Sequence, residues 1–497
     1  MAETQQAASA AATTTEADGK GLLDQILDQT KPADTGERQR NQQFIQEVVR
    51  HALAAKPGSV VAGDIERTIK VWQAEIDKKL SAQLNQIMHH PEFQKLEGTW
   101  RGLDYLVKQS ETSTTLKIKV MNVSKKQLAK DLERAVEFDQ SSLFKKIYEA
   151  EYGTLGGHPF GMIVGDYEFT KHPDDVTMLQ KVSGVAAASH APFVSAAGAE
   201  LLSLDSYTDL NQPRDLAKIF QSVDYTQWRS FRESEDSRYV ALTMPRVLAR
   251  LPYGKDTKPI DEFDFDEAVD GTDHEKYLWM NSAWAFAART TDAFAKDGWF
   301  MRTRGVESGG KVEGLPVHVF KEAGGKTMKC PTEVVIPDRR EAELSDLGFM
   351  PLLHCKNTDF AAFLGTQTTQ KPKKYFDSAA NANAELSTKL NYMMCISRFA
   401  HYLKVMARDK IGSFAERSDM EKWLNSWINN YVIENPEDAG DEMRARHPLR
   451  AAQISVTEVK GKPGYYQAVA HLRPHFQLEG LNTSMRLVAE LPQQAKK

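Results

Sequence analysis

The C-terminal part of the sequence contains two β-type segments on either side of a tight turn. The segment Ile454–Thr457 is rich in β-favouring residues, the turn Gly461–Gly464 holds two glycines and a proline, and Tyr465–Val469 resumes the β pattern. This order predicts a β-hairpin. An isolated hairpin is only marginally stable in water, so it must either pack against its own domain or join a sheet that another chain supplies. The second alternative would make the protein a component of an assembly.

Length and composition indicate a soluble, globular chain of several domains. The 497 residues, 41% hydrophobic and 26% charged, are ordinary for such proteins. A net charge of −5 gives no electrostatic reason to expect nucleic acid as a partner. The three cysteines, Cys330, Cys355 and Cys395, are widely spaced and odd in number, which argues against a disulfide framework and fits a reducing compartment.

The sequence favours neither a signal peptide nor a membrane span. The N-terminal residues lack the basic region and apolar core of a signal peptide. The charge-free run Val182–Ala199 approaches transmembrane length, but it is built largely of Ala, Ser and Gly and contains His190 and Pro192. We therefore expect a buried helix–loop–strand passage at this run, no direct membrane insertion, and a cytoplasmic location.

A short amphipathic segment follows a polar N-terminal tail. Residues 1–20 have almost no apolar surface to bury and are expected to be disordered. One apolar face of two helical turns is formed next by Leu22, Leu23, Ile26 and Leu27. The breaker Lys31–Gly36 ends this helix and serves as a linker. So short a helix is unstable alone, so it must dock on this chain or on a partner.

Apolar residues at intervals of three or four predict a long amphipathic helix over residues 61–88. Its stripe consists of Ile65, Ile69, Trp72, Ile76, Leu80, Leu84 and Ile87. Pro91 ends this helix, and another is predicted from Phe93 onward. Alternation of apolar and polar residues over 115–120 predicts a half-exposed strand.

The remaining chain mixes β-type segments with helices. The β-type segments are 160–164, 192–197, 315–320 and 333–336. From Ser378 to Arg408, apolar residues again recur on one helical face. This order predicts a mixed α/β (α+β), multidomain fold. The predicted parts are a tail, a short helix with its linker, an N-terminal helical and α/β region, a central α/β domain, and a C-terminal part with the long helix and the hairpin. Their boundaries are 1–20, 21–36, 37–150, 151–375 and 376–497.

Two glycine-rich segments come close to a phosphate-binding loop without matching it. Gly305–Val312 has the spacing of a P-loop, but Val312 replaces the hydroxyl residue that holds magnesium, and a β-type segment follows where a helix is required. Gly324–Thr327 has the hydroxyl but carries Phe320 in place of the first glycine. We interpret both as hairpin loops. A nucleotide-binding enzyme with its site near Lys311 or Lys326 is the alternative.

No catalytic or metal-binding constellation is evident. The acidic run Asp261–Ala268 lacks the third ligand and the glycine of a calcium loop, and the histidines have no metal-ligand spacing. Cys395 lies in an apolar helical run and is interpreted as a core residue rather than a nucleophile. We therefore expect no enzyme activity and neither a cofactor nor a metal ion.

Four long blocks of sequence carry a family resemblance. They are Leu80–Val107, Asp297–Phe320, Ser397–Phe414 and Pro463–Leu481. In this order they resemble the large subunit of the type VI secretion contractile sheath, the TssC or VipB family, and the likeness extends over nearly all of the chain past residue 20. The resemblance implies a contractile-tail sheath fold related to that of contractile phage tails.

The resemblance also implies a function and its partners. A small sheath subunit of the TssB or VipA type would pair with this chain through the region 37–150. The heterodimers would stack with copies of themselves into a helical tube around an inner-tube protein, on a baseplate. Contraction would propel the inner tube, and a ClpV-type AAA+ unfoldase would dismantle the spent sheath. A phage-type sheath, which needs no small partner, is the alternative within this class.

Several residues take expected roles from this resemblance. The hairpin would interlock neighbouring subunits in one shared sheet, and its register would be set by Ile454, Val456, Tyr465, Gln467 and Val469. The unfoldase would bind the helix that carries Leu22, Leu23, Ile26 and Leu27, once contraction exposes it.

Two further assignments have structural alternatives. The small subunit would pack on the stripe Ile65, Ile69, Trp72, Ile76, Leu80 and Leu84, although this stripe could equally pack within its own chain. The inner tube would contact a charged segment before the hairpin through Glu437, Asp441, Arg444 and Arg446, and an ordinary surface helix is the other interpretation of that segment.

Overall fold

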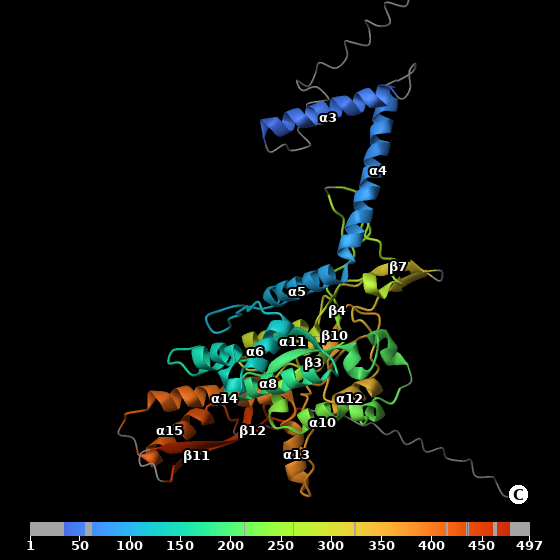
Figure 1. Cartoon of the computed structure of the whole chain (residues 1–497). Coiled ribbons are helices and arrows are strands. Elements are labelled where there is room, and N and C mark those ends of the chain that lie inside the picture. Colours follow the sequence, from blue (N-terminus) through green and yellow to red (C-terminus); the bar gives the residue numbers. More distant parts are fainter. Residues whose placement is uncertain are drawn as a thin grey trace, which may run out of the picture. The chain divides into compact units, whose positions relative to one another are not determined.

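The computed structural model describes residues 34–477, except 55–61, 213, 262, 323–324, 414–415, 434, 436 and 461–464 (Figure 1). The chain divides into two compact units. One comprises residues 1–86 and 254–267, and the other comprises residues 87–253 and 268–497.

The smaller unit is built from two long helices and one loop. The helices are α3 (Thr35–Ala54) and α4 (Ala62–Met88), of which the last two residues belong to the larger unit. The second confirms the helix predicted over 61–88. The loop 254–267 lies beside the end of α4, where Asn85 Nδ2 donates to the carbonyl of Asp266 at 3.4 Å. It contains most of the acidic run and forms a surface loop, closed by an ion pair between Lys255 and Asp264.

The larger unit is organised around a six-stranded mixed sheet with the order β1-β2-β3-β9-β10-β6. Neighbours from β1 to β9 are parallel, whereas β10 is antiparallel to both β9 and β6. The strands are β1 (Ile163–Phe169), β2 (Phe193–Ala197), β3 (Val240–Met244), β6 (Lys311–Val312), β9 (Met350–His354) and β10 (Ala361–Phe363). Because β1 pairs only with β2, it forms one edge of this sheet. The mixed α/β class is thereby confirmed.

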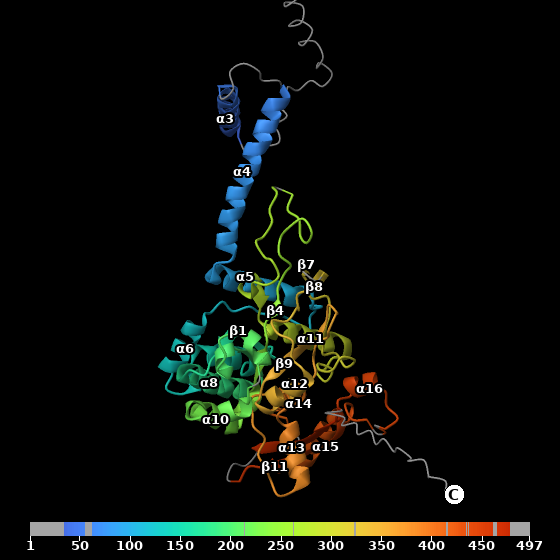
Figure 2. The same ribbon diagram turned by 90° about the vertical axis from the view of Figure 1, so that its right-hand side faces the viewer.

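Helices cover both faces of the sheet (Figures 1 and 2). Alternate strand residues point to opposite faces: Phe193 and Leu242 belong to the core on one face, and Val194 and Ala241 to the core on the other. The first face is covered by α6 (Lys125–Arg134), α7 (Ser142–Phe144), α8 (Pro173–Ser189), α9 (Leu216–Ile219), α10 (Thr226–Glu233), α12 (Asp338–Asp346) and the π-helix Lys145–Tyr152. The second is covered by α11 (Ser282–Asp297), on which α5 (Pro91–Lys108) packs.

The packing of α5 on α11 depends on a glycine. A Cβ atom at Gly102 would stand 2.2 Å from Cδ1 of Trp284, so no larger residue fits while the two helices keep this contact. Pro91 occupies the first turn of α5, and His90 caps it by accepting a hydrogen bond from the backbone N–H of Glu92. The proline therefore ends one helix and begins the next, as the sequence indicated.

The run Val182–Ala199 forms the predicted helix–loop–strand passage. Helix α8 ends at His190, whose left-handed backbone (φ 49°) turns the chain into the fully buried strand β2. Within the described residues, no helix is both long and apolar enough to cross a membrane.

The C-terminal part of the larger unit has its own core. It contains α13 (Ser378–Leu386), α14 (Leu390–Asp409), α15 (Arg417–Asn429), α16 (Asp441–Arg446), and the hairpin strands β11 (Leu449–Glu458) and β12 (Tyr466–Pro474). The rings of Trp299, Phe399, Trp427 and Tyr431 meet at centroid distances between 4.5 and 6.1 Å. The helix predicted from Ser378 to Arg408 is thus two helices, interrupted at residues 387–389.

The strand predictions were only partly correct. The segment 160–164 holds just the start of β1, and 315–320 just the start of the hairpin β7 (Val319–Glu322) and β8 (Gly325–Met328). The small pair β4 (Val247–Leu248) and β5 (Trp279–Met280) was not foreseen. Residues 333–336 are not a strand, since Pro331 and Pro337 flank them and remove backbone donors. Residues 115–120 are not a strand either, because they pair with no other strand within the described part of the chain.

Candidate functional site

The predicted C-terminal hairpin is present and packs against its own chain. Strands β11 and β12 pair in antiparallel register, with Ile454 opposite Ala470 and Val456 opposite Ala468. Ile454 and Val456 are 1% and 3% exposed and belong to the core formed with α14 and α15. Of the two alternatives that the sequence left open, packing against the chain's own domain is therefore realised in the chain by itself.

The five residues proposed to set the register lie on two faces of the hairpin. Ile454 and Val456 face the core, whereas Gln467 and Val469 stand opposite Thr457 and Ser455 on the outer face, where Val469 is 40% exposed. Tyr465 precedes β12 and is 65% exposed; its carbonyl accepts from the N–H of Val459. A one-residue slip would exchange these faces, so the buried pair fixes the register within this chain. Their role between subunits stays a prediction.

Side chains of α15 close the outer edge of β11. The amide of Asn425 donates to the carbonyl of Ile454 (2.7 Å) and accepts from its N–H (2.9 Å). One turn earlier, the carboxylate of Glu421 accepts from the N–H of Val456 (3.0 Å). A side-chain amide offers one donor and one acceptor, as a neighbouring peptide group would. This edge is therefore occupied by the chain itself.

The outer edge of β12, by contrast, is open. Because Ile454 and Val456 turn their peptide groups toward α15, the alternation of antiparallel pairing turns those of Ala470 and Ala468 away from β11. Across the described ranges of the chain, no hydrogen bond to these outward groups is found. An open edge of this kind can accept a further strand.

Glu421 and Asn425 were missed by the sequence analysis. They are spaced i, i+4, beside the apolar positions Leu424 and Ile428 of α15. Polar residues bordering an apolar helical stripe just before a hairpin were the available signal. Such a border usually faces solvent, so the pattern alone could not assign them to a strand edge.

The residues proposed to contact the inner tube lie in and just before α16. Glu437 and Asp441 are exposed. Arg444 lies 3.7 Å from Asp441, and Arg446 lies 2.7 Å from Glu442, as i, i+3 and i, i+4 pairs. Surface pairs of this kind contribute little to stability. Neither of the two interpretations of this segment is favoured by these contacts.

The N-terminal assignments fall partly outside the described residues. Leu22, Leu23, Ile26 and Leu27 lie outside them, as do the side chains of Ile65 and Ile69. On the described part of α4, Trp72 and Leu84 are half-buried, whereas Ile76 and Leu80 are 55% and 46% exposed. The apolar stripe is thus incompletely covered by this chain, and its packing on a small subunit stays a prediction.

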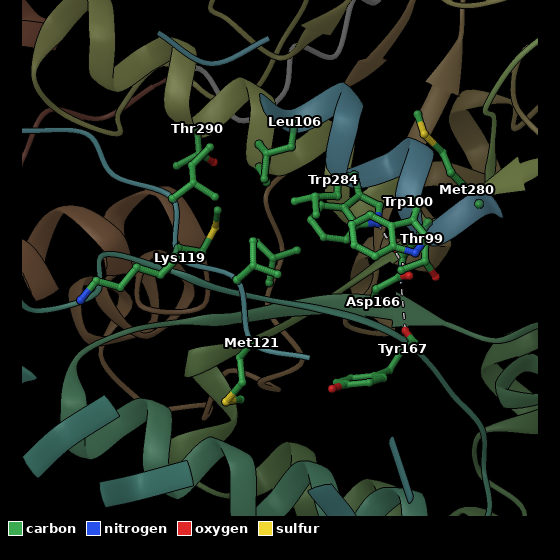
Figure 3. A pocket seen from close by; sticks show the side chains of 18 of the residues that line it. Thr99, Trp100, Leu106, Lys119, Met121, Asp166, Tyr167, Met280, Trp284 and Thr290 are labelled. Carbon is green, nitrogen blue, oxygen red and sulfur yellow. Dashed lines mark hydrogen bonds between the residues drawn. The ribbon is translucent and has the colours of Figure 1, made fainter. Parts of the chain in front are cut away.

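A groove of about 1470 Å³ lies beside the sheet edge β1. Its walls are α5, α11, β1 and an extended segment, residues 116–124 (Figure 3). Figure 3 shows Lys119 and Met121 on the segment, across from Leu106 and Trp284, while Trp284 Nε1 donates to Asp166 on β1 at 3.2 Å. The cavity exceeds the range of about 300–1,000 Å³ that is usual for small-molecule sites.

The glycine-rich segments do not form phosphate sites. Gly305–Val312 is a loop that leads into β6, with no helix N-terminus behind it, and the Lys311 ammonium pairs with Glu313 and stacks on Phe360. Lys326 and Thr327 lie on strand β8 of the β7–β8 hairpin, and β6 pairs with β10 rather than with a preceding strand. The interpretation of both segments as hairpin loops was therefore only partly correct.

Burial and hydrogen bonding shift the thiol pKa values of two of the cysteines in opposite directions. Cys395 is fully buried in α14, and burial raises the pKa of its thiol far above the ordinary value. At Cys330 burial alone would raise the thiol pKa, but hydrogen bonds with His354 and Thr332 outweigh it and lower the pKa. No group of three or more metal-ligating side chains occurs among the residues that the structure describes.

Comparisons with known proteins agree with this architecture. The family model "EvpB/VC_A0108, tail sheath N-terminal domain" matches residues 71–370, and "EvpB/VC_A0108, tail sheath gpW/gp25-like domain" matches residues 379–491. The type VI secretion system sheath protein TssC1 of Pseudomonas aeruginosa is 52% identical over 470 residues, which cover 94% of each chain.

Two solved structures of an anti-feeding prophage show weaker likeness. The first is the baseplate, with a TM-score of 0.34 and 11% identity over 63% of this chain and 66% of that chain. The second is the contracted helical sheath, with a TM-score of 0.25 and 10% identity over 64% of this chain and 67% of that chain.

Proposed function

The chain belongs to the EvpB/VC_A0108 tail sheath family, and from this premise we propose that it is the large structural subunit of a cytoplasmic type VI secretion sheath. It co-assembles with a small sheath subunit into a helical tube around an inner tube, on a baseplate. Contraction of this tube propels the inner tube, and an AAA+ unfoldase recycles the spent subunits. The protein acts through its contacts and not as an enzyme.

The observation that carries the proposal is the asymmetry of the C-terminal hairpin. Its β11 edge is anchored to α15 by Asn425 and Glu421, while its β12 edge keeps outward peptide groups at Ala468 and Ala470. A strand from a neighbouring subunit can add to the open edge without unfolding the anchored one. Such backbone pairing keeps subunits connected while the segments that flank the hairpin change direction.

The energy of contraction is stored at assembly in this proposal. The two glycine-rich loops lack the geometry of nucleotide sites, so the extended and contracted states must differ in their subunit contacts. ATP is then used only by the unfoldase. The helix of Leu22, Leu23, Ile26 and Leu27 is its proposed binding element, hidden before contraction and accessible afterwards.

Co-expression with the small sheath subunit of the same organism, followed by negative-stain electron microscopy, tests the function. Hollow tubes that require both chains support it. Tubes from this chain alone would favour the phage-type alternative. Discrete particles together with saturable ATP binding, lost in Lys311→Ala, would instead support the enzyme.

The recycling role has a separate test. Leu23→Asp places a charge on the apolar face of the N-terminal helix, so it should leave tube formation intact and slow disassembly by the unfoldase. Turbidity of preformed tubes with unfoldase and ATP measures the rate. Thr14→Asp, in the polar tail, is the control, and an unchanged rate in Leu23→Asp would refute the role.

A further inference from the structure

The groove beside β1 is bordered on one side by a backbone that has no strand partner. In the extended segment, none of the backbone N–H groups of residues 117–123 donates a hydrogen bond to any described residue. Side chains hold the segment in place: the Lys119 ammonium pairs with Glu151, Tyr167 Oη donates to the carbonyl of Val123 (2.8 Å), and Lys125 Nζ donates to that of Glu168 (2.7 Å). Most of these residues are exposed in the chain by itself, so their N–H groups can bond to water and remain available to a further strand.

The opposite border is the free edge of β1. Ser195 on β2 donates to the carbonyls of Gly165 (2.7 Å) and Tyr167 (2.8 Å), so these two point into the sheet. The carbonyl of Asp166, between them, has no partner among the described residues. Two unpaired extended backbones therefore border one groove, and β-strand addition can satisfy both.

Apolar side chains line the groove between these borders. Leu96 and Trp100 of α5 are 56% and 62% exposed, and Val120 and Met121 of the extended segment are 65% and 48% exposed. Large apolar side chains that gather in one groove typically mark an interaction site. Alternate apolar residues of an added strand would meet them.

The two ends of the groove carry opposite charge. Carboxylates gather at the carboxyl ends of β1 and β2, namely Glu168, Glu200 and Asp205. The guanidinium of Arg246 is shared there by Glu333 (3.0 Å) and Glu168 (3.5 Å), whereas Glu200 and Asp205 form no ion pair with a described residue. Burial, chiefly, raises the pKa of Glu168, and Glu333 and Asp166 add to this effect while Arg246 opposes it. This end therefore favours a cation.

The other end is cationic. Arg398 of α14 lies over the rings of Phe294 and Phe300, with its guanidinium carbon 4.4 and 5.6 Å from their centroids. Nowhere in the described part of the chain does it form an ion pair with a carboxylate, although one of its hydrogen bonds goes to Tyr402 (2.6 Å). It is therefore placed to receive an anion.

We propose that the groove binds an extended segment of the small sheath subunit, which pairs with β1 and with residues 117–123. Alternate side chains of this segment are apolar, with Lys or Arg at the end beside Glu168 and a carboxylate at the end beside Arg398. The inference rests on the proposed sheath function, which supplies the partner. Residues 1–33 of the chain itself are another candidate occupant of the groove. With five acidic and two basic side chains they carry a net negative charge, which does not complement the acidic end.

Site-specific photocross-linking locates the occupant. A benzoylphenylalanine at position 121 of the full chain, co-expressed with the small subunit, should cross-link to that subunit in the assembled tubes. A cross-link to residues 478–497 or to a second copy of this chain would overturn the proposal. Tubes of the unlabelled chain report the sheath function independently, so the two can fail separately.

A matched pair of substitutions measures the contribution of the groove. Met121→Asp should reduce the small subunit that co-purifies with the tagged chain by about tenfold, because it places a charge on a buried contact. Val223→Asp makes a comparable change at a side chain that is 86% exposed and outside the groove, and should leave the yield unchanged. Equal yields from the two would refute the site.

Hydrogen exchange tests the same pairing without any substitution. The amides of residues 117–123 in the wild-type chain should exchange more slowly when the small subunit is bound, because strand addition gives them acceptors. Exchange at the same rate in the free chain and in the complex would contradict the proposed pairing.

Discussion

The hairpin and the extended segment 117–123 have similar sequence patterns and different structures. Both contain alternating apolar and polar residues, and strands were predicted for the hairpin and for residues 115–120, which overlap this segment. Strand β11 has β12 on one side and the side chains of Asn425 and Glu421 on the other. Residues 117–123 have no strand beside them among the residues that the structure describes. The comparison teaches that a period of two predicts an extended backbone and its faces, whereas pairing depends on which neighbour the fold supplies.

The largest expected effect concerns the open edge of β12. The double variant Ala468→Pro/Ala470→Pro removes two outward N–H groups without removing a hydrogen bond between β11 and β12. We expect tube formation to fall by about tenfold or more, because strand addition loses two backbone hydrogen bonds. Tubes are counted by electron microscopy, and the small subunit should still co-purify.

The control keeps both donors. Ala468→Thr/Ala470→Thr retains the N–H groups and favours β structure, so it should assemble normally. Abundant tubes from the proline variant would show that the open edge is not used. Val456→Pro is a poorer test, because the N–H of Val456 bonds to Glu421 and not to β12.

The sequence predicted those elements whose apolar and polar pattern lies within one continuous stretch of residues. The helix α4, the passage from α8 into β2, and the C-terminal hairpin all follow from residues that are near one another in sequence. The Asn425 clamp on Ile454 and the groove formed by α5 and β1 depend on residues that are distant in sequence. A single sequence does not assign such contacts, because the polar border of α15 is equally compatible with a face exposed to solvent.

A moderate effect is expected at the closed edge of β11. Asn425→Leu leaves the N–H and carbonyl of Ile454 without partners, and should lower the free energy of unfolding by about 2–3 kcal/mol. Urea unfolding of the purified heterodimer measures this loss. Asn429→Leu makes the same change at the exposed end of α15 and should cost less than about 0.5 kcal/mol. If Asn425→Leu costs no more free energy of unfolding than Asn429→Leu, water must satisfy the peptide group of Ile454 in place of the Asn425 side chain.

The smallest expected effect tests α14, which joins the two regions. His401 lines the groove, and its Nε2 donates to the carbonyl of Ser189 at 2.9 Å. Burial, chiefly, together with His190, Arg398 and Lys404, lowers its pKa to about 4. Since the unfolded value is about 6.5, the folded state resists protonation. Stability is therefore complete above pH 6.5 and is lost as the pH falls toward 4, by about 2 kcal/mol at pH 5.

Unfolding of the wild type and of His401→Gln at pH 7.5 and pH 5 measures this contribution. The glutamine can still donate to Ser189 but does not titrate, so the additional loss at pH 5 should shrink by about 2 kcal/mol. His471→Gln, at an exposed position of β12, should keep the full loss. If protonation of His401 also releases the small subunit before the hairpin unfolds, α14 couples the groove to the C-terminal core. If the small subunit dissociates and the hairpin unfolds in a single transition, α14 does not act as a separate link. The groove and the hairpin then differ only in whether another chain or their own chain completes the strand pairing.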